Sequence, residues 1–460
     1  MASGAPLISP VPVPGSALRT LAATEPELFP VLLDSAAQGP LARFSLLAFE
    51  PRAVLTRDSR GKVTGQGVTL VAGGFLDNLE AWYRRESNPR RAGSASLPSL
   101  PFWGGWMVHL GYELAAEIEP SLQLPPASPA CSALALRVEH LAIHDATTDT
   151  VYAVSEHGDT ATHARLVAHL IEAARRPFAE STGPLPLESL TEEAPQHYLA
   201  RVRRAKEHIA AGDIYQANLS RPWVLKLRDE VDRRQIFGAL RRSNPSPFAA
   251  SWRQGIEFHS SSPERLMRID AGEISTRPIA GTRARVGDAE QDRRETAELV
   301  AHPKERAEHI MLIDLERNDL GRVCEAGSVR VDEYMITESY QHVHHIVSNV
   351  RGRMRPDRSP IDALRALFPG GTITGCPKVR CMQIISALEG RGRGAYTGSA
   401  GWLGVDGDAD FNILIRTLTV NGPHVEFRAG GGIVADSVPE RELEETRAKA
   451  RGMLRAFTTP

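Results

Sequence analysis

The pattern of apolar and polar positions divides the chain into two parts of different texture. Residues 1–175 contain short apolar runs broken by Gly and Pro, with helical spacing of apolar residues at 76–85 and 161–175. From residue 197 onward the periodic stretches become longer. Between the two parts, residues 176–196 are rich in Pro, Ser, Thr and Glu without a sustained period, which predicts a surface linker.

The second part, residues 197–460, is predicted to contain strands and helices that follow one another without strict alternation. Because a doubly wound parallel sheet needs that alternation, the pattern favours the α+β class with large antiparallel sheets. No dinucleotide-binding glycine motif follows a strand, and no P-loop occurs. The predicted strands are 214–227, 255–269 and 424–435, and the predicted helices are 197–211, 307–320, 361–368, 377–389 and 440–457.

The composition points to a small molecule as the partner. Of the 460 residues, 42% are hydrophobic and 24% are charged, as in an ordinary globular protein. The 54 basic and 56 acidic residues nearly cancel, so nothing favours a nucleic-acid or membrane partner. No run of about 18 apolar residues could span a bilayer, and no signal peptide is recognisable, so we expect a cytoplasmic protein. The four cysteines are too scattered for a disulfide framework and are expected to be reduced.

Two pairs of glutamates stand near the starts of predicted helices: Glu305 with Glu308, and Glu442 with Glu445. Residues three apart share a helix face. Either pair alone is explained by the preference of a helix N-terminus for acids. Brought together, four carboxylates would repel one another and need a counter-ion, for which Mg²⁺ with its oxygen ligands is the simplest choice. Lys449, four residues after Glu445, could meet a bound anion.

Three glycine-containing segments are candidates for a ligand site, because glycine lets main-chain amides approach a ligand closely. GGGIVADS at 430–437 joins a predicted strand to the last helix, and its N–H groups could bind an anionic oxygen. FPGGTITGCPK at 368–378 and RPIAGTRAR at 277–285 are the other two. Each segment taken alone is equally well explained as a flexible turn.

These segments together resemble the chorismate-utilising enzymes, the family that includes anthranilate synthase component I, aminodeoxychorismate synthase component I, and the isochorismate and salicylate synthases. The resemblance runs in the family's order over roughly residues 195–457. It implies an anthranilate synthase component I-like fold with a two-layer core of large antiparallel sheets and helices packed outside. The matching segments are GDIYQANLS, SSPERL, RPIAGTR, KERAEHIMLIDLERNDLGRV, ESYQHVHHIVSNVRG, FPGGTITGCPKVR, AYTGSAGW, FNILIRTL, GGGIVADSVPERELEET and AKARGML.

The resemblance implies a Mg²⁺ site and a chorismate site. Glu308 and Glu445 match the direct metal ligands, while Glu305 and Glu442 match the carboxylates that hold the metal's waters. An arginine in the matched set suits a substrate carboxylate, because its fork offers two parallel hydrogen bonds. The residues that match the chorismate site are Gly281, Thr282, Thr372, Tyr396, Arg416, Gly430, Gly432 and Lys449.

Three further residues match positions of catalytic importance. Glu264 matches the acid that protonates the departing C4 hydroxyl, a task that needs a raised pKa. His345 matches the histidine that anthranilate synthases use for elimination, although a histidine in such an apolar run is more often structural. Gln216 stands where water-using relatives carry a lysine base. Because an amide cannot take a proton from water, Gln216 implies ammonia as the nucleophile.

Two ammonia-using activities compete within the resemblance. The segment PVLLDSAAQGPLARFSLLAFEP resembles that of the aminodeoxychorismate synthases, which favours amination of chorismate at C4. Ala280 favours the anthranilate synthases, because the best-studied type of aminodeoxychorismate synthase carries a nucleophilic lysine there and a methyl group cannot attack. We expect C4 amination without a lysyl adduct. A non-catalytic chorismate-binding protein is a third possibility, which the complete set of matching residues disfavours.

The expected partner follows from what the sequence lacks. It has no amidotransferase signature with a reactive Cys and His pair, so ammonia is expected from a separate glutaminase subunit. The N-terminal region, 1–175, would carry no chemistry. By resemblance it is a candidate site for bound tryptophan.

Overall fold

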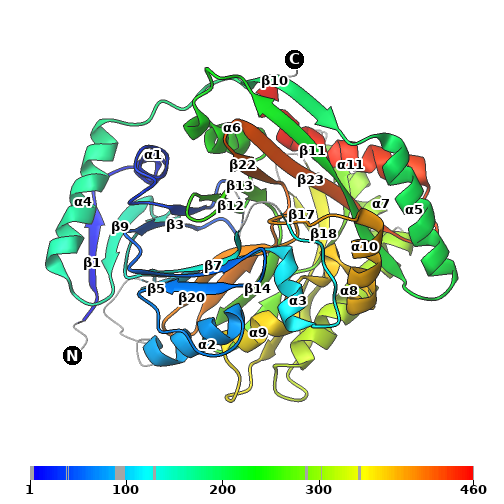
Figure 1. Ribbon diagram of the computed structural model, residues 1–460, viewed down its shortest axis with the longest axis horizontal. Helices are drawn as coiled ribbons and strands as arrows, with labels where there is room; N and C mark the ends of the chain where they lie inside the picture. The colour runs from blue at the N-terminus through cyan, green and yellow to red at the C-terminus, as the bar shows by residue number, and fades with distance from the viewer. Residues whose placement is uncertain are drawn as a thin grey trace.

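The computed structural model describes residues 5–37, 39, 41–88, 99–127, 131–284, 289–301, 303–339 and 343–458. Two large sheets carry the fold (Figure 1). Every pairing between the described strands is antiparallel except that of β10 with β24. This confirms the predicted α+β class.

The two sheets have 13 and 11 strands and are named sheet A and sheet B. In order across the sheet, sheet A contains β1 (Leu7–Val11), β9 (Thr150–Ser155), β8 (His140–Asp145), β3 (Phe44–Phe49), β2 (Val31–Asp34), β12 (Phe248–Trp252), β13 (Glu257–Ser262), β22 (Thr417–Asn421), β23 (His424–Ile433), β11 (Gln216–Leu227), β10 (Leu185–Glu192) and β24 (Phe457–Thr458), with β19 (Gly375–Cys376) beside β11. Sheet B contains β16 (Ile279–Ala284), β18 (Val343–Arg353), β15 (Glu273–Thr276), β14 (Arg265–Asp270), β21 (Ala409–Asn412), β20 (Ser399–Gly404), β6 (Gly105–Leu110), β7 (Cys131–Val138), β4 (Ala53–Asp58) and β5 (Val63–Gln66), with β17 (Arg330–Ser339) beside β18.

The helices include those predicted from apolar spacing, with ends that differ by a few residues. They are α1 (Ser16–Thr24), α2 (Phe75–Glu86), α3 (Ala115–Ile118), α4 (Thr160–Arg175), α5 (Pro195–Ala210), α6 (Ile236–Ser243), α7 (Ala289–Ala301), α8 (Pro303–Gly321), α9 (Pro360–Leu367), α10 (Lys378–Glu389) and α11 (Pro439–Leu454). Short 3₁₀ turns are η2 (Tyr112–Leu114), η3 (Arg233–Gln235) and η4 (Gly371–Ile373).

The core between the two sheets is built from buried apolar residues on facing strands. Leu46 of β3 and Trp252 of β12 come from sheet A, and Met107 of β6 and Leu136 of β7 come from sheet B. Further apolar clusters fill the space between each sheet and the helices outside it. The layers are therefore helices, sheet A, sheet B and helices, as the family resemblance implies (Figure 1).

Strands β6 and β7 show why parts of the sequence lack a clear strand period. All residues of both strands are buried. Met107 and Leu136 face sheet A, whereas Trp106 and Val108 of β6 belong to the cluster under α2 and α9. A strand covered on both faces needs apolar residues at every position, which removes the alternation of apolar and polar residues.

Strands from both parts of the sequence share each sheet. β2 pairs with β12 in sheet A, and β6 pairs with β20 in sheet B. Segment 176–196 is not simply a surface linker, because Leu185–Glu192 form β10, which pairs with β11 and β24. Leu185 and Leu187 are buried. Only these few apolar positions among Pro and Glu signal the strand, so the pattern missed it. The division of the chain into two regions stays a prediction.

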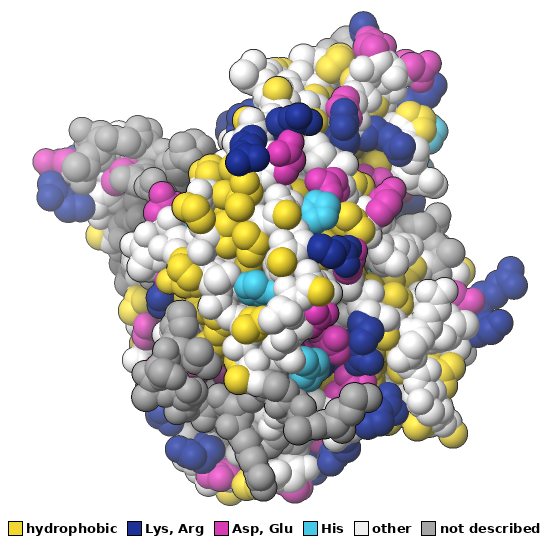
Figure 2. All heavy atoms as spheres, turned by 90° about the vertical axis from the view of Figure 1, so that its left-hand side faces the viewer, with side chains coloured by type: hydrophobic (Ala, Val, Ile, Leu, Met, Phe, Trp, Pro, Cys, Tyr) yellow, Lys and Arg dark blue, Asp and Glu magenta, His cyan; other side chains and the backbone are white. Residues whose placement is uncertain are grey.

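The surface has a mixed character on the face where α1 and α4 lie. Figure 2 shows hydrophobic side chains in a central band, with basic and acidic side chains interspersed around it. This agrees with the near balance of charges in the sequence. Within the described ranges, no helix combines the length and the apolar character that a membrane crossing requires.

A buried ion network joins the end of α10 to sheet A. Glu389 accepts hydrogen bonds from Arg393 and from Arg428 of β23, each at 2.7 Å. The N–H and the hydroxyl of Ser220 on β11 also donate to Glu389, at 2.8 and 2.9 Å. Burial raises the pKa of this carboxyl, but the two guanidinium groups outweigh burial and hold the pKa at about 2. The network therefore remains ionised throughout the neutral range.

We expect Glu389→Gln to lower the free energy of unfolding by about 3–5 kcal/mol, because it leaves two buried guanidinium groups without their counter-charge. The measurement is the urea midpoint at constant m-value. The wild-type contribution should be complete above pH 4.5 and disappear as pH falls toward 2, since the folded pKa lies below the ordinary value. Glu188→Gln, which breaks the exposed pair with Lys226, is the control and should cost less than about 1 kcal/mol. Equal losses of unfolding free energy for the two variants would contradict the role of Glu389 as the counter-charge of the two buried guanidinium groups.

Candidate active site

The glycine run of residues 430–432 lies inside β23, not at the joint between the strand and the last helix. Both ends of the run are crowded. A Cβ on Gly430 would lie 2.4 Å from the carbonyl oxygen of Leu219, and one on Gly432 would lie 2.1 Å from Nε2 of Gln216. Gly431 faces the carboxylates of α11. A side chain at Gly430 would therefore clash with the backbone, one at Gly432 would displace the end of the Gln216 side chain, and one at Gly431 would be in ordinary contact with the carboxylates.

Gly430 and Gly432 direct their N–H groups away from β11. They are paired with Ser220 and Asn218 of that strand. The Asn218 N–H donates instead to a carbonyl of the loop before α10, and the Ser220 N–H donates to the Glu389 carboxylate. Paired residues of an antiparallel ladder exchange both hydrogen bonds or neither. The N–H groups of both glycines are thus on the other edge of β23.

That other edge is open because β22 separates from β23. The two strands pair only as far as Leu418 with Phe427. Arg416, directly before β22, has a left-handed φ of 53°, and its carbonyl accepts the Ser261 N–H at 3.0 Å. Among the described strands, no other strand pairs with this edge of β23. The N–H groups of Gly430 and Gly432 therefore lie on an edge of β23 that is beyond the pairing with β22.

Three of the four predicted metal-binding glutamates approach the glycine run from two helices. A Cβ on Gly431 would lie 3.4 Å from Oε1 of Glu445 and 3.5 Å from Oε2 of Glu442, both on α11. Glu308 of α8 accepts a hydrogen bond from Gln216 Nε2 at 3.3 Å, and that same nitrogen lies against Gly432. Carboxylates far apart in sequence thus meet along one short stretch of β23.

Glu305 completes the predicted set, but its side chain lies outside the described residues. Among the side chains that the structure describes, no group of three or more His, Cys, Asp or Glu is arranged to hold a metal ion. Lys449 forms an ion pair with Glu445 at 2.7 Å and donates to the carbonyl of Gly430 at 2.9 Å. One of the carboxylates at the run is therefore already partly neutralised by a lysine.

Glu264 lies buried between β13 and β14 with its carboxyl held by Thr372. The Thr372 hydroxyl donates to Oε1 of Glu264 at 2.6 Å. Burial raises the pKa of Glu264 to about 7, against the opposing effects of Thr372 and of the charges on Arg416 and Lys449. The surroundings thus keep a carboxylic acid available at neutral pH, which is the property that a general acid needs.

Tyr396 and Arg416 lie at the same end of the glycine run. A Cβ on Gly430 would be 2.9 Å from the Tyr396 hydroxyl. Burial raises the pKa of Tyr396, and burial lowers the pKa of Arg416 against the attraction of Tyr396, Glu264 and Glu445. Arginine stays charged in proteins. A buried cation near a phenol and two open backbone amides forms a suitable site for a carboxylate.

The remaining predicted residues lie on sheet B. Gly281 has a left-handed φ of 63°, which glycine adopts without strain. The side chains of Ala280 and Thr282 on β16 and of His345 on β18 lie outside the described residues. The backbone register pairs Thr282 with His345. These two positions are therefore neighbours, but where their side chains point stays a prediction.

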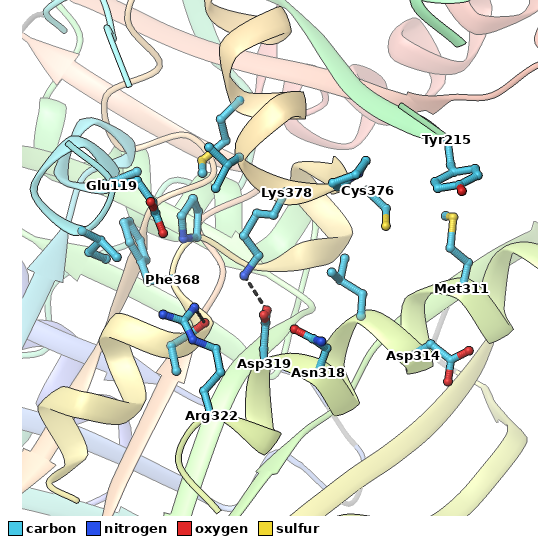
Figure 3. A pocket seen from close by; sticks show the side chains of 18 of the residues that line it. Glu119, Tyr215, Met311, Asp314, Asn318, Asp319, Arg322, Phe368, Cys376 and Lys378 are labelled. Atoms are coloured by element: carbon cyan, nitrogen blue, oxygen red, sulfur yellow. Dashed lines mark hydrogen bonds and ion pairs between the residues drawn. The ribbon is translucent and has the colours of Figure 1, made fainter. Parts of the chain in front are cut away.

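Cavities lined by described residues also lie outside the glycine run. The first, of about 840 Å³, is lined by α8, by Tyr215 and by the start of α10, and contains the ion pair of Asp319 with Lys378 (Figure 3). The second, of about 420 Å³, is lined by Asp34 and Ser35 of the LLDS segment and by residues of sheet B. Tryptophan binding by the N-terminal region, residues 1–175, stays a prediction.

Several buried polar residues near the site were not anticipated. Tyr198 of α5 is buried, and burial together with the charges of Glu442 and Glu445 raises its pKa well above the usual value. Glu316 of α8 is also buried. The sequence does indicate that Glu316 lies on the same helix face as Glu308, because the two residues are eight apart. Tyr198 carries no comparable signal, since an aromatic residue in an amphipathic helix is usually a core residue.

Comparison with known proteins identifies the family to which this arrangement belongs. Residues 31–455 match the family described as chorismate binding enzyme. The chain belongs to this family. Anthranilate synthase component 1 of Thermus thermophilus is 39% identical over 459 residues, covering 96% of this chain and 95% of that protein. Aminodeoxychorismate synthase component 1 of Bacillus subtilis is 48% identical over 257 residues, covering 56% of this chain and 54% of that protein.

A solved structure supports the same membership in the chorismate-binding enzyme family. The crystal structure of anthranilate synthase component I from Streptococcus pneumoniae superposes with a TM-score of 0.79 at 30% identity, covering 90% of this chain and 93% of that chain. The expected anthranilate synthase component I-like fold is therefore confirmed. Relatives bear both candidate names, so family membership alone does not choose between the two products.

We expect Gly432→Ala to keep the fold but lose turnover of chorismate. The new Cβ meets only the end of the Gln216 side chain, which must move away from Glu308. Displacements of about 1 Å in an active site cost about a hundredfold in rate. Gly430→Ala is the matched variant, because its Cβ meets the backbone oxygen of Leu219 and should cost about 1–3 kcal/mol of stability. Steady-state kinetics and thermal unfolding should separate the two; a Gly432→Ala protein with full turnover would contradict this geometry.

Proposed function

We propose that this protein is the chorismate-aminating component of an aminodeoxychorismate synthase, which forms 4-amino-4-deoxychorismate and water from chorismate and ammonia. The observation that carries this proposal concerns Gln216. This residue is buried at the glycine run, and its amide nitrogen donates a hydrogen bond to Glu308. Water-using relatives carry a lysine base in the matching position. An amide cannot remove a proton from water. Ammonia is a nucleophile without the help of a base, and so suits a site built this way.

The proposed substrate carries two carboxylates, and the site has separate partners for them. The pyruvyl carboxylate would bind Arg416 and Tyr396 and accept hydrogen bonds from the N–H groups of Gly430 and Gly432. A bidentate arginine contact with backbone amides is strong and directional. The ring carboxylate would lie on the side of the glutamates, where a cation is needed to hold it. This arrangement would fix the ring between β23 and the Thr372 turn.

The donor atoms around the glycine run fit Mg²⁺. Carboxylate oxygens are its preferred protein ligands, and it commonly uses one or two of them while it keeps several waters. Glu308 and Glu445 would bind the ion directly, and Glu305 and Glu442 would hold its waters. In addition, Oε1 of Gln216 is buried without a hydrogen-bond partner among the described atoms. When bound, Mg²⁺ would supply positive charge for the ring carboxylate and for orientation of the ring.

Glu264 would be the general acid of the reaction. As the C4–O bond breaks, the departing oxygen takes the Glu264 proton and leaves as water, while ammonia forms the C4–N bond and gives up one proton. Burial and the Thr372 hydrogen bond hold this acid in place. Proton transfer by a positioned acid commonly accelerates such a step by about 10²–10⁴-fold. Because Ala280 cannot form a lysyl adduct, ammonia would react directly with the ring.

The ammonia would come from a separate glutaminase subunit. The sequence carries no amidotransferase signature, and free ammonia is scarce at neutral pH because most of it is protonated. A glutaminase docked to this chain would release ammonia near the site. The isolated chain should therefore depend on a high concentration of ammonium salt at alkaline pH.

Anthranilate synthase is the second candidate. Ala280 favours it, because the anthranilate synthases carry alanine there by the resemblance. The anthranilate synthase of Thermus thermophilus also matches nearly the whole chain, whereas the Bacillus subtilis aminodeoxychorismate synthase matches about half. Against this stands the LLDS segment, Leu32 to Ser35, which favours the aminodeoxychorismate synthases. Both candidate reactions lose the C4 hydroxyl as water. They differ in the carbon that ammonia attacks, which is C4 for 4-amino-4-deoxychorismate and C2 for anthranilate, and only anthranilate formation also eliminates pyruvate.

Product analysis distinguishes the candidates. The protein is incubated with chorismate, Mg²⁺ and ammonium at alkaline pH, and aminodeoxychorismate lyase is then added. We expect para-aminobenzoate to form only after the lyase is added. Fluorescent anthranilate without the lyase would establish the second candidate instead. Failure to consume chorismate, with binding retained, would support a non-catalytic chorismate-binding protein.

Glu308→Gln and Glu445→Gln should each abolish turnover, because each removes negative charge from a direct ligand of the proposed Mg²⁺. The Mg²⁺-dependent tightening of chorismate binding, measured by calorimetry, should disappear in the same variants. The control is Glu444→Gln on the same helix, whose exposed carboxylate pairs with Arg447 and should be dispensable. Near-normal rates for either ligand variant at saturating Mg²⁺ would refute the ligand assignment.

A further inference from the structure

A second buried acid lies close to Glu264. Glu316, on the inner face of α8, is 4% exposed. Its Oε2 accepts a hydrogen bond from the hydroxyl of Thr276 at 2.9 Å, and its Oε1 lies 3.3 Å from where a Cβ on Gly371 would be. The next residue, Thr372, donates to Glu264. The two carboxyl groups therefore flank the same short turn, η4.

Glu316 does not line the cavity of about 840 Å³, but its neighbours on α8, Leu315 and Asp319, do. Asp319, one turn further along α8, is 5% exposed and forms an ion pair with Lys378 at the start of α10. Both side chains line the cavity, and Figure 3 shows the pair inside it. Lys378 also donates to the carbonyl of Leu367 at 3.2 Å. Polar groups thus continue from Glu316 to a cavity large enough for water.

Two buried carboxyls, those of Glu316 and Asp319, lie one turn apart on α8, and Lys378 forms its ion pair with Asp319. Burial raises the pKa of Glu316 to about 7, and the charges of Asp319 and of Glu264 add to this effect, whereas Lys378 and Thr276 oppose it. Arg322, also on the cavity wall, favours ionisation of Asp319. Burial raises the pKa of Asp319 as well, but Asp319 has the ion pair with Lys378, whereas Glu316 meets the Thr276 hydroxyl and the η4 turn.

We propose that Glu316 supplies protons to Glu264: it returns a proton to the general acid after each turnover and draws its own from cavity water beside Asp319 and Lys378. The proposal rests on the proposed function, in which Glu264 loses its proton to the leaving oxygen. Glu264 is then a carboxylate. A proton passes from Glu316 toward Glu264 by way of the turn that carries the Thr372 hydroxyl, and water in the cavity reprotonates Glu316. No oxidant or other reactant is required.

A purely structural role explains this cluster less well. Glu316 lies on the same helix as Leu312 and Leu315, beside buried apolar side chains. A leucine there would avoid the cost of burying an acid without a counter-charge of its own. Buried acids that are linked both to a reacting acid and to a water-filled cavity are the arrangement that proton transfer requires. Glu316 touches no substrate, so it acts only through Glu264.

The test is Glu316→Gln, which keeps the shape and can still accept the Thr276 hydrogen bond but cannot exchange a proton. We expect kcat to fall about tenfold or more while KM for chorismate stays within about twofold, because a proton-transfer step becomes limiting. The solvent deuterium isotope effect on kcat should increase. Small carboxylic acids such as acetate should restore kcat in a concentration-dependent way. Asp314→Asn, which removes an exposed carboxylate of the same helix and cavity, should change none of these quantities.

Unchanged kcat in Glu316→Gln would overturn the proposal, and so would a lower kcat that responds neither to acetate nor to deuterium. Should Glu316→Gln fail to fold, Glu316→Leu, which fills the space with an apolar side chain, should give the same acetate-dependent rate. Infrared spectroscopy at pH 7 reports the protonation state of Glu316 without any turnover of substrate. A protonated carboxyl band of the wild type should vanish in the variant, and its persistence would contradict the proposal. If the wild type forms no amino product, the proposed function fails, while the infrared result still reports whether Glu316 holds a proton.

Discussion

Three consecutive residues without side chains, Gly430 to Gly432, are the constraint on which the whole candidate site depends. Each glycine leaves space that a different neighbour uses: a backbone carbonyl, a pair of carboxylates and the Gln216 amide. Carboxylates held this close repel one another, and the interior offers little dielectric screening of that repulsion. Lys449 offsets one charge. In the proposed function a hard cation would share these carboxylates.

The fold could be anticipated in outline because its elements have strong local signals. The spacing of apolar residues predicts the long helices. The lack of a strict alternation of strands with helices favours antiparallel sheets. β10 was missed, because Leu185 and Leu187 are almost its only buried apolar residues and Pro and Glu surround them. β6 and β7 are hard to recognise for the opposite reason. Both of their faces are buried, which removes the alternation of apolar and polar residues that marks a strand. Strand neighbours such as β2 and β12 are beyond the reach of any local pattern.

The site was partly accessible from the sequence for a similar reason. Glu442 and Glu445 share a helix face by spacing alone, and so their common approach to β23 follows from helix geometry. That Glu308 would meet the same strand depended on the family resemblance, because no local rule joins α8 to β23. The partners of Glu389 and the surroundings of Glu316 depend on contacts between distant segments. Periodicity cannot report such contacts, since it sees one element at a time.

Helix α8 shows how the molecule separates two kinds of acid. Near its start, Glu308 accepts a hydrogen bond from the Gln216 amide beside the glycine run. Two turns later, Glu316 meets a hydroxyl and the backbone of a tight turn, so that its neutral form is favoured. One rigid element thus presents a carboxylate suited to a metal ion and a carboxylic acid suited to proton transfer. Their separation is fixed by the rise of the helix.

The sharing of both sheets between the two ends of the sequence has a consequence for biosynthesis. β6 lies between β7 and β20, and β20 leaves the ribosome only after most of the chain has been made. At ordinary rates of translation this delay is of the order of tens of seconds. During that time β6 has an unsatisfied edge that can pair with other chains. The second edge of β6 therefore stays unpaired until residues 399–404 have been made, and neither end of the sequence can complete sheet B without the other.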